Sequence, residues 1–233
     1  MIHNIFPVSI WQAQYKQFET FNEQCLNDTL KYTDETGKTG EDRFNKLHQL
    51  PEYEHFYRYV SCQIKRYIEA MGVSTLGMDV NVTKSWFEIK KETTLATHAH
   101  WDNHYSFVYV VNNPDEIRKD IFFEHPNPIH HHNEPHMGFF NWSRIENTYE
   151  NTRSWTFPSD VGTLYVFPSK LQHGTHGIYD AEFTTSSGIF SYDDAKSSRV
   201  VIAGDTIISI NDDEKSVYNH LGLKNPNEWR NYK

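Results

Sequence analysis

The stretch HAHWDNHYSFVYVV, residues 98–111, joins three histidines and an aspartate to a dense apolar run that ends at Asn112. A second stretch, GTLYVFPSKLQHGTH at 162–176, places His173 just beyond a run of large residues and a Phe-Pro-Ser turn. Short apolar runs bounded by turn residues predict the strands of a sandwich or barrel. Both stretches therefore place metal-binding side chains at the ends of expected strands.

Further strand-like runs fill the chain between residues 79 and 210. They lie at 80–82, 86–89, 121–124, 154–157, 162–167, 183–192, 199–203 and 206–210. Many short strands separated by turn signals favour a mainly β architecture. We expect one domain, with a helical support region at 1–78, a β core at 79–210 and a polar C-terminal tail at 211–233.

Two amphipathic helices are expected ahead of the β core. The first spans 10–31, where large residues recur at near-helical spacing, and the second spans 51–71. Pro51 suits the first turn of the second helix and Gly72 is placed to end it. Both helices are expected to pack against the sheet.

The composition excludes several classes of protein. Lys and Arg total 22 and Asp and Glu total 31, so the net charge is −9, which repels the phosphates of duplex nucleic acid. No apolar run approaches the roughly 18 residues of a membrane span, and the N-terminus lacks the pattern of a signal peptide. We expect a cytoplasmic protein whose two cysteines are free thiols.

The histidines offer two alternative metal sites. His98 and His100 are two residues apart, as are His100 and Asp102, and side chains two apart in an extended segment project to the same side. Either pair could share one metal ion with His173. Two histidines and a carboxylate form the facial triad of non-haem Fe(II) sites. A site of three histidines is the alternative.

Together, these blocks resemble the 2-oxoglutarate/Fe(II)-dependent dioxygenase superfamily, and within it the small oxygenases of marine phages and bacteria. The resemblance extends from about residue 4 to 204 and includes IFPVSIW at 5–11, FFEHP at 122–126 and RVVIAG at 199–204. It implies a double-stranded β-helix, or jelly roll, with supporting N-terminal helices. It also implies Fe(II), 2-oxoglutarate and O2 as cofactor and cosubstrates, with ascorbate in support. A small-molecule or peptidyl substrate would be hydroxylated, with release of succinate and CO2. A phage-encoded enzyme would act in the host cytoplasm, and a homodimer is an open alternative.

The resemblance assigns the metal ligands to His100, Asp102 and His173. His98 competes with Asp102, because related sequences often carry H-x-H at this place. The histidine-rich stretch 125–136 has no counterpart role; a solvated loop and a rim of the active site are the two interpretations.

The resemblance also assigns the far carboxylate of 2-oxoglutarate to Arg199, at the head of an apolar strand. Arginine supplies a planar fork that suits a carboxylate. Tyr109, or Ser106 if the strand parity differs, would supply a hydroxyl to the cosubstrate. The 26 positions between His173 and Arg199 (199 − 173) predict an inserted hairpin around 184–197. Without one, Lys84 or Lys170 would hold the carboxylate.

Two other functions fit the same residues. A cupin-like enzyme would use His98, His100 and His173 without 2-oxoglutarate, and Arg199 would then not need to face the cavity. In a non-catalytic jelly-roll binding protein, the histidines would not converge.

Overall fold

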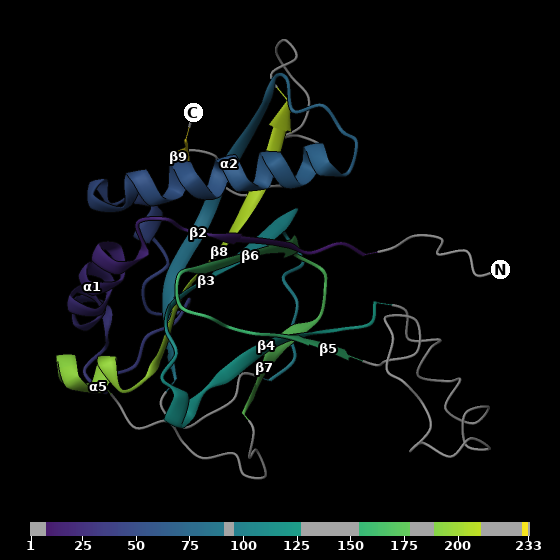
Figure 1. Ribbon diagram of the computed structural model, residues 1–233. Coiled ribbons are helices and arrows are strands. Elements are labelled where there is room, and N and C mark those ends of the chain that lie inside the picture. Colours follow the sequence, from purple (N-terminus) through teal and green to yellow (C-terminus); the bar gives the residue numbers. More distant parts are fainter. Residues whose placement is uncertain (1–7, 91–95, 127–153, 178–188, 211–229, 233) are drawn as a thin grey trace, which may run out of the picture.

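The computed structural model describes residues 8–90, 96–126, 154–177, 189–210 and 230–232 (Figure 1). Two antiparallel sheets form the β core. The large sheet has the order β1-β6-β3-β8-β2-β9, with β1 at Trp11–Gln14, β6 at Thr163–Pro168, β3 at Tyr105–Asn112, β8 at Arg199–Ile210, β2 at Met78–Lys90 and β9 at Arg230–Asn231. The small sheet has the order β5-β4-β7, with β5 at Ser154–Phe157, β4 at Lys119–Glu124 and β7 at His173–Gly177.

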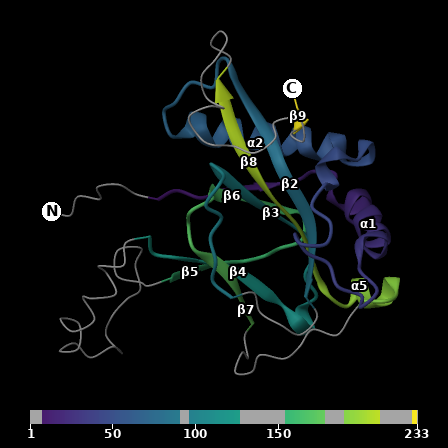
Figure 2. The same ribbon diagram turned by 180° about the vertical axis from the view of Figure 1, so that it is seen from behind.

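Helices cover the outer side of the large sheet. The helices are α1 at Phe18–Thr29, α2 at Glu54–Ala70 and α5 at Tyr192–Lys196, with 3-10 turns at Leu30–Tyr32, Leu47–Gln49, Pro51–Tyr53 and Asp115–Ile117. Both views place α2 and the small sheet on opposite sides of the large sheet (Figures 1 and 2). None of the described helices is long and apolar enough to cross a membrane.

Alternation along each strand gives the large sheet two different faces. The side chains toward α1 and α2 join the larger apolar cluster, which includes Phe87, Phe107, Tyr109, Val166 and Ile202. The side chains toward the small sheet join a second cluster with β4, which includes Val108, Ile121, Phe123, Phe167 and Val201. The space between the sheets is therefore partly apolar, as the predicted jelly roll requires.

The second helix follows its sequence signals closely. A 3-10 turn at Pro51–Tyr53 leads into α2, and Gly72 beyond its end has φ 83°. Phe56, Tyr57 and Val60 lie buried on one face of α2. The expected helix at 51–71 is thus present as a short turn and a longer α-helix.

The first expected helix is wrong over its N-terminal part. Trp11–Gln14 forms β1, which pairs with β6 in the register Trp11↔Val166, and α1 begins only at Phe18. Without β1, strand β6 would be an edge strand with unpaired backbone groups. This tertiary pairing overrides the local helical spacing.

Two further expectations near the C-terminus differ from the structure. The runs 199–203 and 206–210 form one continuous strand, β8, which pairs along both edges with β2 and β3. Within the described part of 184–197, the chain forms the helix α5 and no hairpin. The expected strand at 183–192 and the expected hairpin fall partly on residues 178–188, which lie outside the described residues, as do 127–153 and 211–229.

Gly204 lets β8 pass close to its neighbours. A Cβ atom on Gly204 would lie 2.7 Å from Cε1 of Phe107 and 2.8 Å from the backbone oxygen of Lys84. Phe107 is fully buried, so its ring has little room to move. The crowding therefore explains why a glycine suits this point of the strand.

Replacing Gly204 with alanine should lower the free energy of unfolding of the metal-free protein by about 1–3 kcal/mol, the range for overpacked cores. Urea denaturation measures this change. In a Phe107→Ala background, the added cost of Gly204→Ala should be smaller, because the obstructing ring is absent. Equal costs in the two backgrounds would contradict the proposed clash.

Candidate metal centre

Three histidines from two separate parts of the sequence converge on one point. The ligating nitrogens of His98, His100 and His173 lie within 4.8 Å of one another. His98 and His173 form an antiparallel bridge, in which each backbone N–H donates to the other residue's carbonyl at 3.0 Å. The N–H of His100 donates to the carbonyl oxygen of Ser169 at 2.8 Å. Backbone hydrogen bonds thus fix the segment before β3 against the start of β7.

The hydrogen bonds of the three rings leave the same nitrogen free. The Nδ1 atom of His98 lies 2.9 Å from the carbonyl oxygen of Ala96, and that of His173 lies 2.9 Å from the carbonyl oxygen of Leu171. Nδ1 of His100 lies 2.6 Å from Oδ1 of Asp205. Carbonyl and carboxylate oxygens accept hydrogen bonds, so each Nδ1 carries the proton. With the proton on Nδ1, a neutral ring presents the lone pair of Nε2 to a metal ion.

Burial keeps two of these rings neutral. Desolvation, reinforced by the neighbouring His98 and His100, lowers the pKa of His173 to about 3. Desolvation also lowers the pKa of His98. Metal ions bind the deprotonated imidazole, so burial prepares these side chains for a metal.

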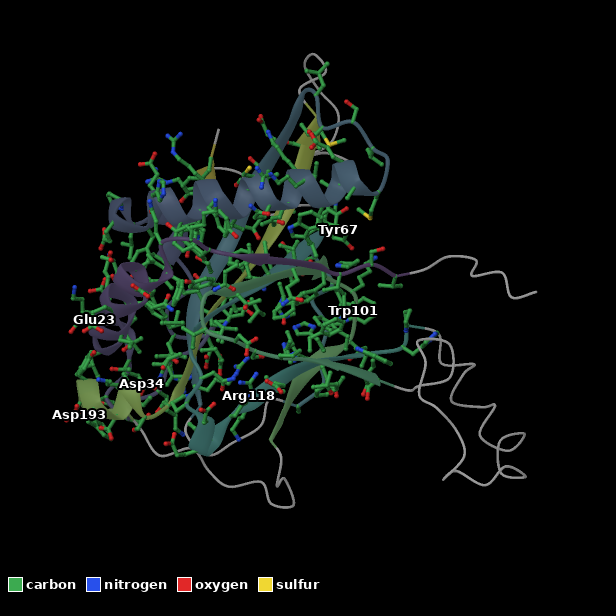
Figure 3. The ribbon with its side chains drawn as sticks, viewed as in Figure 1. Glu23, Asp34, Tyr67, Trp101, Arg118 and Asp193 are labelled. Carbon is green, nitrogen blue, oxygen red and sulfur yellow. The ribbon has the colours of Figure 1, made fainter. Side chains whose placement is uncertain are left out.

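The structure places Asp102 outside this group. Trp101 and Asp102 form an exposed turn, and Trp101, labelled in Figure 3, is 69% exposed. The turn ends the extended geometry that places His98 and His100 on one side, so the two-residue spacing does not carry through to Asp102. Among the described residues, the convergent set is the competing one, with His98 in place of Asp102.

A carboxylate does contact the site, but from a position that the sequence analysis missed. Asp205 lies on β8, is fully buried, and accepts hydrogen bonds from His100 and from the Ser106 hydroxyl, the latter at 2.5 Å. Desolvation raises the pKa of Asp205, but the contacts with His100, Lys84 and Ser106 outweigh it and hold the pKa below its ordinary value. The sequence signal that could have identified Asp205 is its position as an aspartate within the apolar run IAGDTI at 202–207.

A cavity of about 270 Å³ lies between the sheets and includes all three histidines. Its apolar wall includes Trp86, Val108, Ile121, Phe167 and Val201, and the segment 39–43 forms another part of its lining. Arg199 lines the same cavity. The predicted arginine and the predicted histidines therefore line the same cavity.

Arg199 is a buried cation that forms no ion pair with an acid among the residues that the structure describes. Its side chain is 2% exposed, and its Nε donates to the carbonyl oxygen of Lys119 at 3.2 Å. In the described part of the chain, no Asp or Glu forms an ion pair with it. Desolvation lowers the pKa of Arg199 to about 10, although Glu88 and Asp120 oppose the shift. The guanidinium is still charged at neutral pH, and an anion in the cavity would compensate its burial.

Of the other predicted residues, Ser106 and Tyr109 lie on opposite faces of β3. Ser106 lines the cavity, whereas Tyr109 is buried on the helix side, where its hydroxyl donates to Oδ1 of Asn22 at 2.6 Å. Successive side chains on β3 point to opposite faces, so Tyr109 cannot reach the cavity that Ser106 lines. Lys84 forms ion pairs with Glu41 and Asp205, and Lys170 is exposed.

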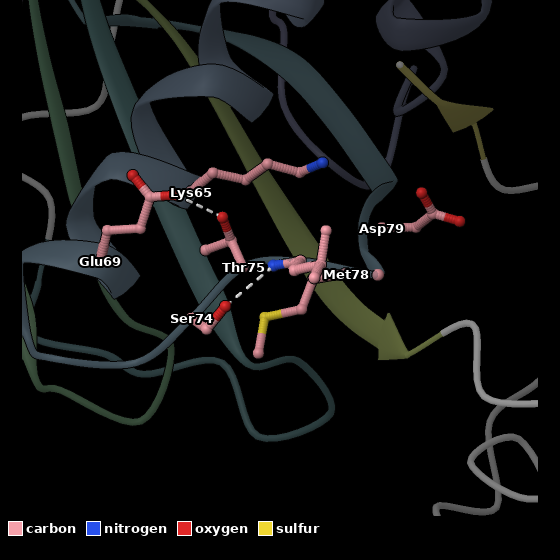
Figure 4. A pocket seen from close by; sticks show the side chains of 8 residues that line it. Lys65, Glu69, Ser74, Thr75, Met78 and Asp79 are labelled. Carbon is pink, nitrogen blue, oxygen red and sulfur yellow. Dashed lines mark hydrogen bonds between the residues drawn. The ribbon is translucent and has the colours of Figure 1, made fainter.

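A second hollow lies at the end of α2, away from the histidines (Figure 4). Its volume is about 790 Å³, and its lining includes Lys65, Glu69, Thr75, Met78 and Asp79. It shares no lining residue with the histidine cavity. It therefore adds nothing to the metal centre.

Comparisons with known proteins give a family match and two similar folds. Residues 84–186 match the family described as "Putative 2OG-Fe(II) oxygenase". The fold is similar to that of the non-heme alpha ketoglutarate dependent carbocyclase SnoK from nogalamycin biosynthesis, with a TM-score of 0.54, 9% identity, and coverage of 97% of this chain and 92% of that chain. It is also similar to that of EctD from S. alaskensis, crystallised with 2-oxoglutarate and 5-hydroxyectoine. The TM-score is 0.51, the identity is 10%, and the match covers 86% of this chain and 72% of that chain. A search of curated proteins found no match. The similarity to solved structures confirms the predicted jelly-roll fold.

The two alternative ligand sets predict different effects of substitution. His98→Ala should weaken Ni(II) binding by at least about tenfold, because it removes a nitrogen from the convergent group. Asp102→Ala should leave the affinity unchanged, because Asp102 lies on an exposed turn. Calorimetric titration of Ni(II) into both variants measures the difference. The reverse order would return Asp102 to the ligand set.

Proposed function

Because residues 84–186 match the family described as "Putative 2OG-Fe(II) oxygenase", we propose that this chain is a 2OG-Fe(II) oxygenase, that His98, His100 and His173 hold its iron and that Arg199 holds its 2-oxoglutarate. The enzyme is a 2-oxoglutarate-dependent non-haem iron dioxygenase. Its proposed reaction is the hydroxylation of a small-molecule or peptidyl substrate, with release of succinate and CO2. The observation that carries the proposal is the buried guanidinium of Arg199 in the same cavity as the three histidines.

The donor set fits iron. Three neutral imidazoles suit Fe(II) as well as zinc, copper and nickel, and each Nδ1 is already satisfied by an oxygen acceptor. A bound ion would also satisfy the Nε2 lone pairs, which crowd together in a partly buried place. When bound, Fe(II) and 2-oxoglutarate supply the chemistry that reduces O2, converts 2-oxoglutarate to succinate and CO2, and oxidises the substrate.

Arg199 would bind the remote carboxylate of 2-oxoglutarate. The guanidinium keeps its charge and offers parallel N–H donors to a carboxylate. Its Nε is engaged by the carbonyl oxygen of Lys119, which orients the side chain and leaves the terminal nitrogens for a ligand. An anion bound here would offset the cost of burying the charge.

Part of the remaining wall of the cavity is apolar. Trp86, Val108, Ile121, Phe167 and Val201 present apolar surface around the histidines and Arg199. Apolar surface beside a site limits the access of water, which strengthens nearby electrostatic contacts and suppresses side reactions. These residues would therefore confine the oxidation to a substrate docked near the histidines.

The position of Arg199 also bears on the cupin-like alternative. An enzyme that did not use 2-oxoglutarate would have no need of a buried arginine facing the histidines, whereas Arg199 lines their cavity. The convergence of the histidines likewise counts against a non-catalytic binding protein.

Arg199→Met should weaken 2-oxoglutarate binding by about 1.5–3 kcal/mol, which is roughly tenfold or more, because it removes hydrogen bonds to a charged group. Ni(II) affinity should stay unchanged, since Arg199 is not in the histidine group. Anaerobic titration of 2-oxoglutarate into the Fe(II) protein, followed by its charge-transfer band, measures the loss.

Two variants control for charge and position. Arg199→Lys keeps a positive charge without the fork and should bind with intermediate affinity. Lys170→Met removes an exposed cation and should bind like the wild type. If Arg199→Met binds 2-oxoglutarate as well as the wild type does, the proposed role of Arg199 is wrong.

His173→Ala should abolish Fe(II)-dependent formation of succinate from 2-oxoglutarate, because it removes one of three nitrogen donors. His104→Asn is a matched control on the segment before β3. His104 Nδ1 accepts a hydrogen bond from the N–H of Ile208 at 3.0 Å, and the asparagine oxygen can replace this acceptor. This variant should retain turnover. Full succinate production by a folded His173→Ala protein would exclude His173 as a ligand.

A further inference from the structure

We propose that Asp205 is a positioning residue, which holds His100 in the tautomer that presents Nε2 to the metal. We further propose that Lys84 links this carboxylate to Glu41 in the lining of the cavity. The inference rests on the proposed metal site.

The carboxylate of Asp205 contacts one of the three histidines and two side chains beside it. Oδ1 lies 2.6 Å from Nδ1 of His100 and accepts a hydrogen bond from the Ser106 hydroxyl. Oδ2 lies 3.1 Å from Nζ of Lys84. The carboxylate is fully buried, so solvent cannot compete for these contacts. An acceptor held this close to Nδ1 selects the Nδ1–H tautomer of His100.

His100 depends on this contact more than the other two ligands depend on theirs. His98 and His173 pair through their backbones, and the Nδ1 atoms of both lie near carbonyl oxygens of residues two positions earlier. Backbone carbonyls are supplied by any sequence that follows the same path. The Nδ1 partners of His100 are instead side chains, Oδ1 of Asp205 at 2.6 Å and the Ser106 hydroxyl at 3.4 Å. Because the Asp205 contact is much the shorter, the tautomer of His100 depends mainly on the identity of residue 205.

Lys84 supplies the opposite charge that a buried carboxylate requires. It lies directly opposite Asp205 in the register of β2 and β8. Its Nζ also lies 2.6 Å from Oε1 of Glu41 and 5.7 Å from the ring centre of Trp86. Glu41 and Trp86 both line the cavity. The series Glu41, Lys84, Asp205 and His100 thus connects the cavity lining to a metal ligand.

Asp205→Asn tests the role with little change of shape. The Lys84 ammonium should attract the amide oxygen and turn the amide NH2 toward His100. An N–H donor at this place requires Nδ1 to accept, which moves the proton to the metal-facing Nε2. In two-bond ¹H–¹⁵N spectra of the metal-free protein, His100 should change from Nδ1–H to Nε2–H, while His98 and His173 keep their tautomer. Ni(II) affinity, measured by calorimetry, should fall by about 10–100-fold.

Two further variants separate positioning from general stability. Thr206→Val removes a neighbouring buried hydroxyl on β8 that donates to the carbonyl oxygen of Tyr105 at 3.0 Å, and it should change neither the His100 tautomer nor Ni(II) affinity. In Asp205→Asn with Lys84→Met, the ammonium is absent, so the amide oxygen can turn to His100. This double variant should recover the Nδ1–H signal and part of the lost affinity.

The outcomes distinguish this inference from the proposed function. If Asp205→Asn keeps both the Nδ1–H signal of His100 and wild-type Ni(II) affinity, Asp205 is not a positioning residue. If Asp205→Asn does not fold, the wild-type spectrum decides, since an Nε2–H His100 would overturn the inference. If the wild type binds neither Ni(II) nor Fe(II), the proposed metal site fails, while the spectra of the metal-free protein still test the contact between Asp205 and His100.

Discussion

The pairing of β8 between β2 and β3 is the constraint on which the rest of the site depends. Arg199, Val201, Ala203 and Asp205 are alternate residues of one strand, so they share the face toward the small sheet. The first three line the cavity, and Asp205 contacts His100. One strand therefore carries a buried cation at one end of this row and a buried carboxylate at the other. Hydrogen bonds along both edges of β8 hold the backbone of Arg199 and of Asp205 in place.

The two buried charges have different partners, and the difference suits different tasks. Asp205 is compensated within the protein by Lys84, Ser106 and His100. Arg199 contacts a backbone carbonyl and, among the described residues, forms no ion pair with an acid. Burying a charge is costly, so a charge paired within the protein suits a structural contact, and a charge without an ion pair suits a ligand site. The proposed roles follow from this contrast.

Much of the fold was predictable because local patterns and tertiary packing agree there. The α2 segment has a proline at its start, a glycine beyond its end and one apolar face, and the runs that became β3, β4, β5 and β6 are bounded by turn residues. The failures lie where distant contacts decide. Residues 11–14 have helical spacing but form a strand, because they pair with the backbone of β6. The single strand β8 continues through Gly204, because a glycine there leaves room for the Phe107 ring.

The sequence by itself determined the chemistry of the site: an H-x-H-x-D segment before one strand, His173 beyond another, and Arg199 at the head of a third. It could not choose between His98 and Asp102, because both are two residues from His100 and the choice depends on where the extended backbone ends. Only the tertiary structure placed the turn at Trp101 and Asp102 and paired His98 with His173. It alone brought Asp205 to His100 across 105 positions, because strand pairing joins residues that no local pattern relates.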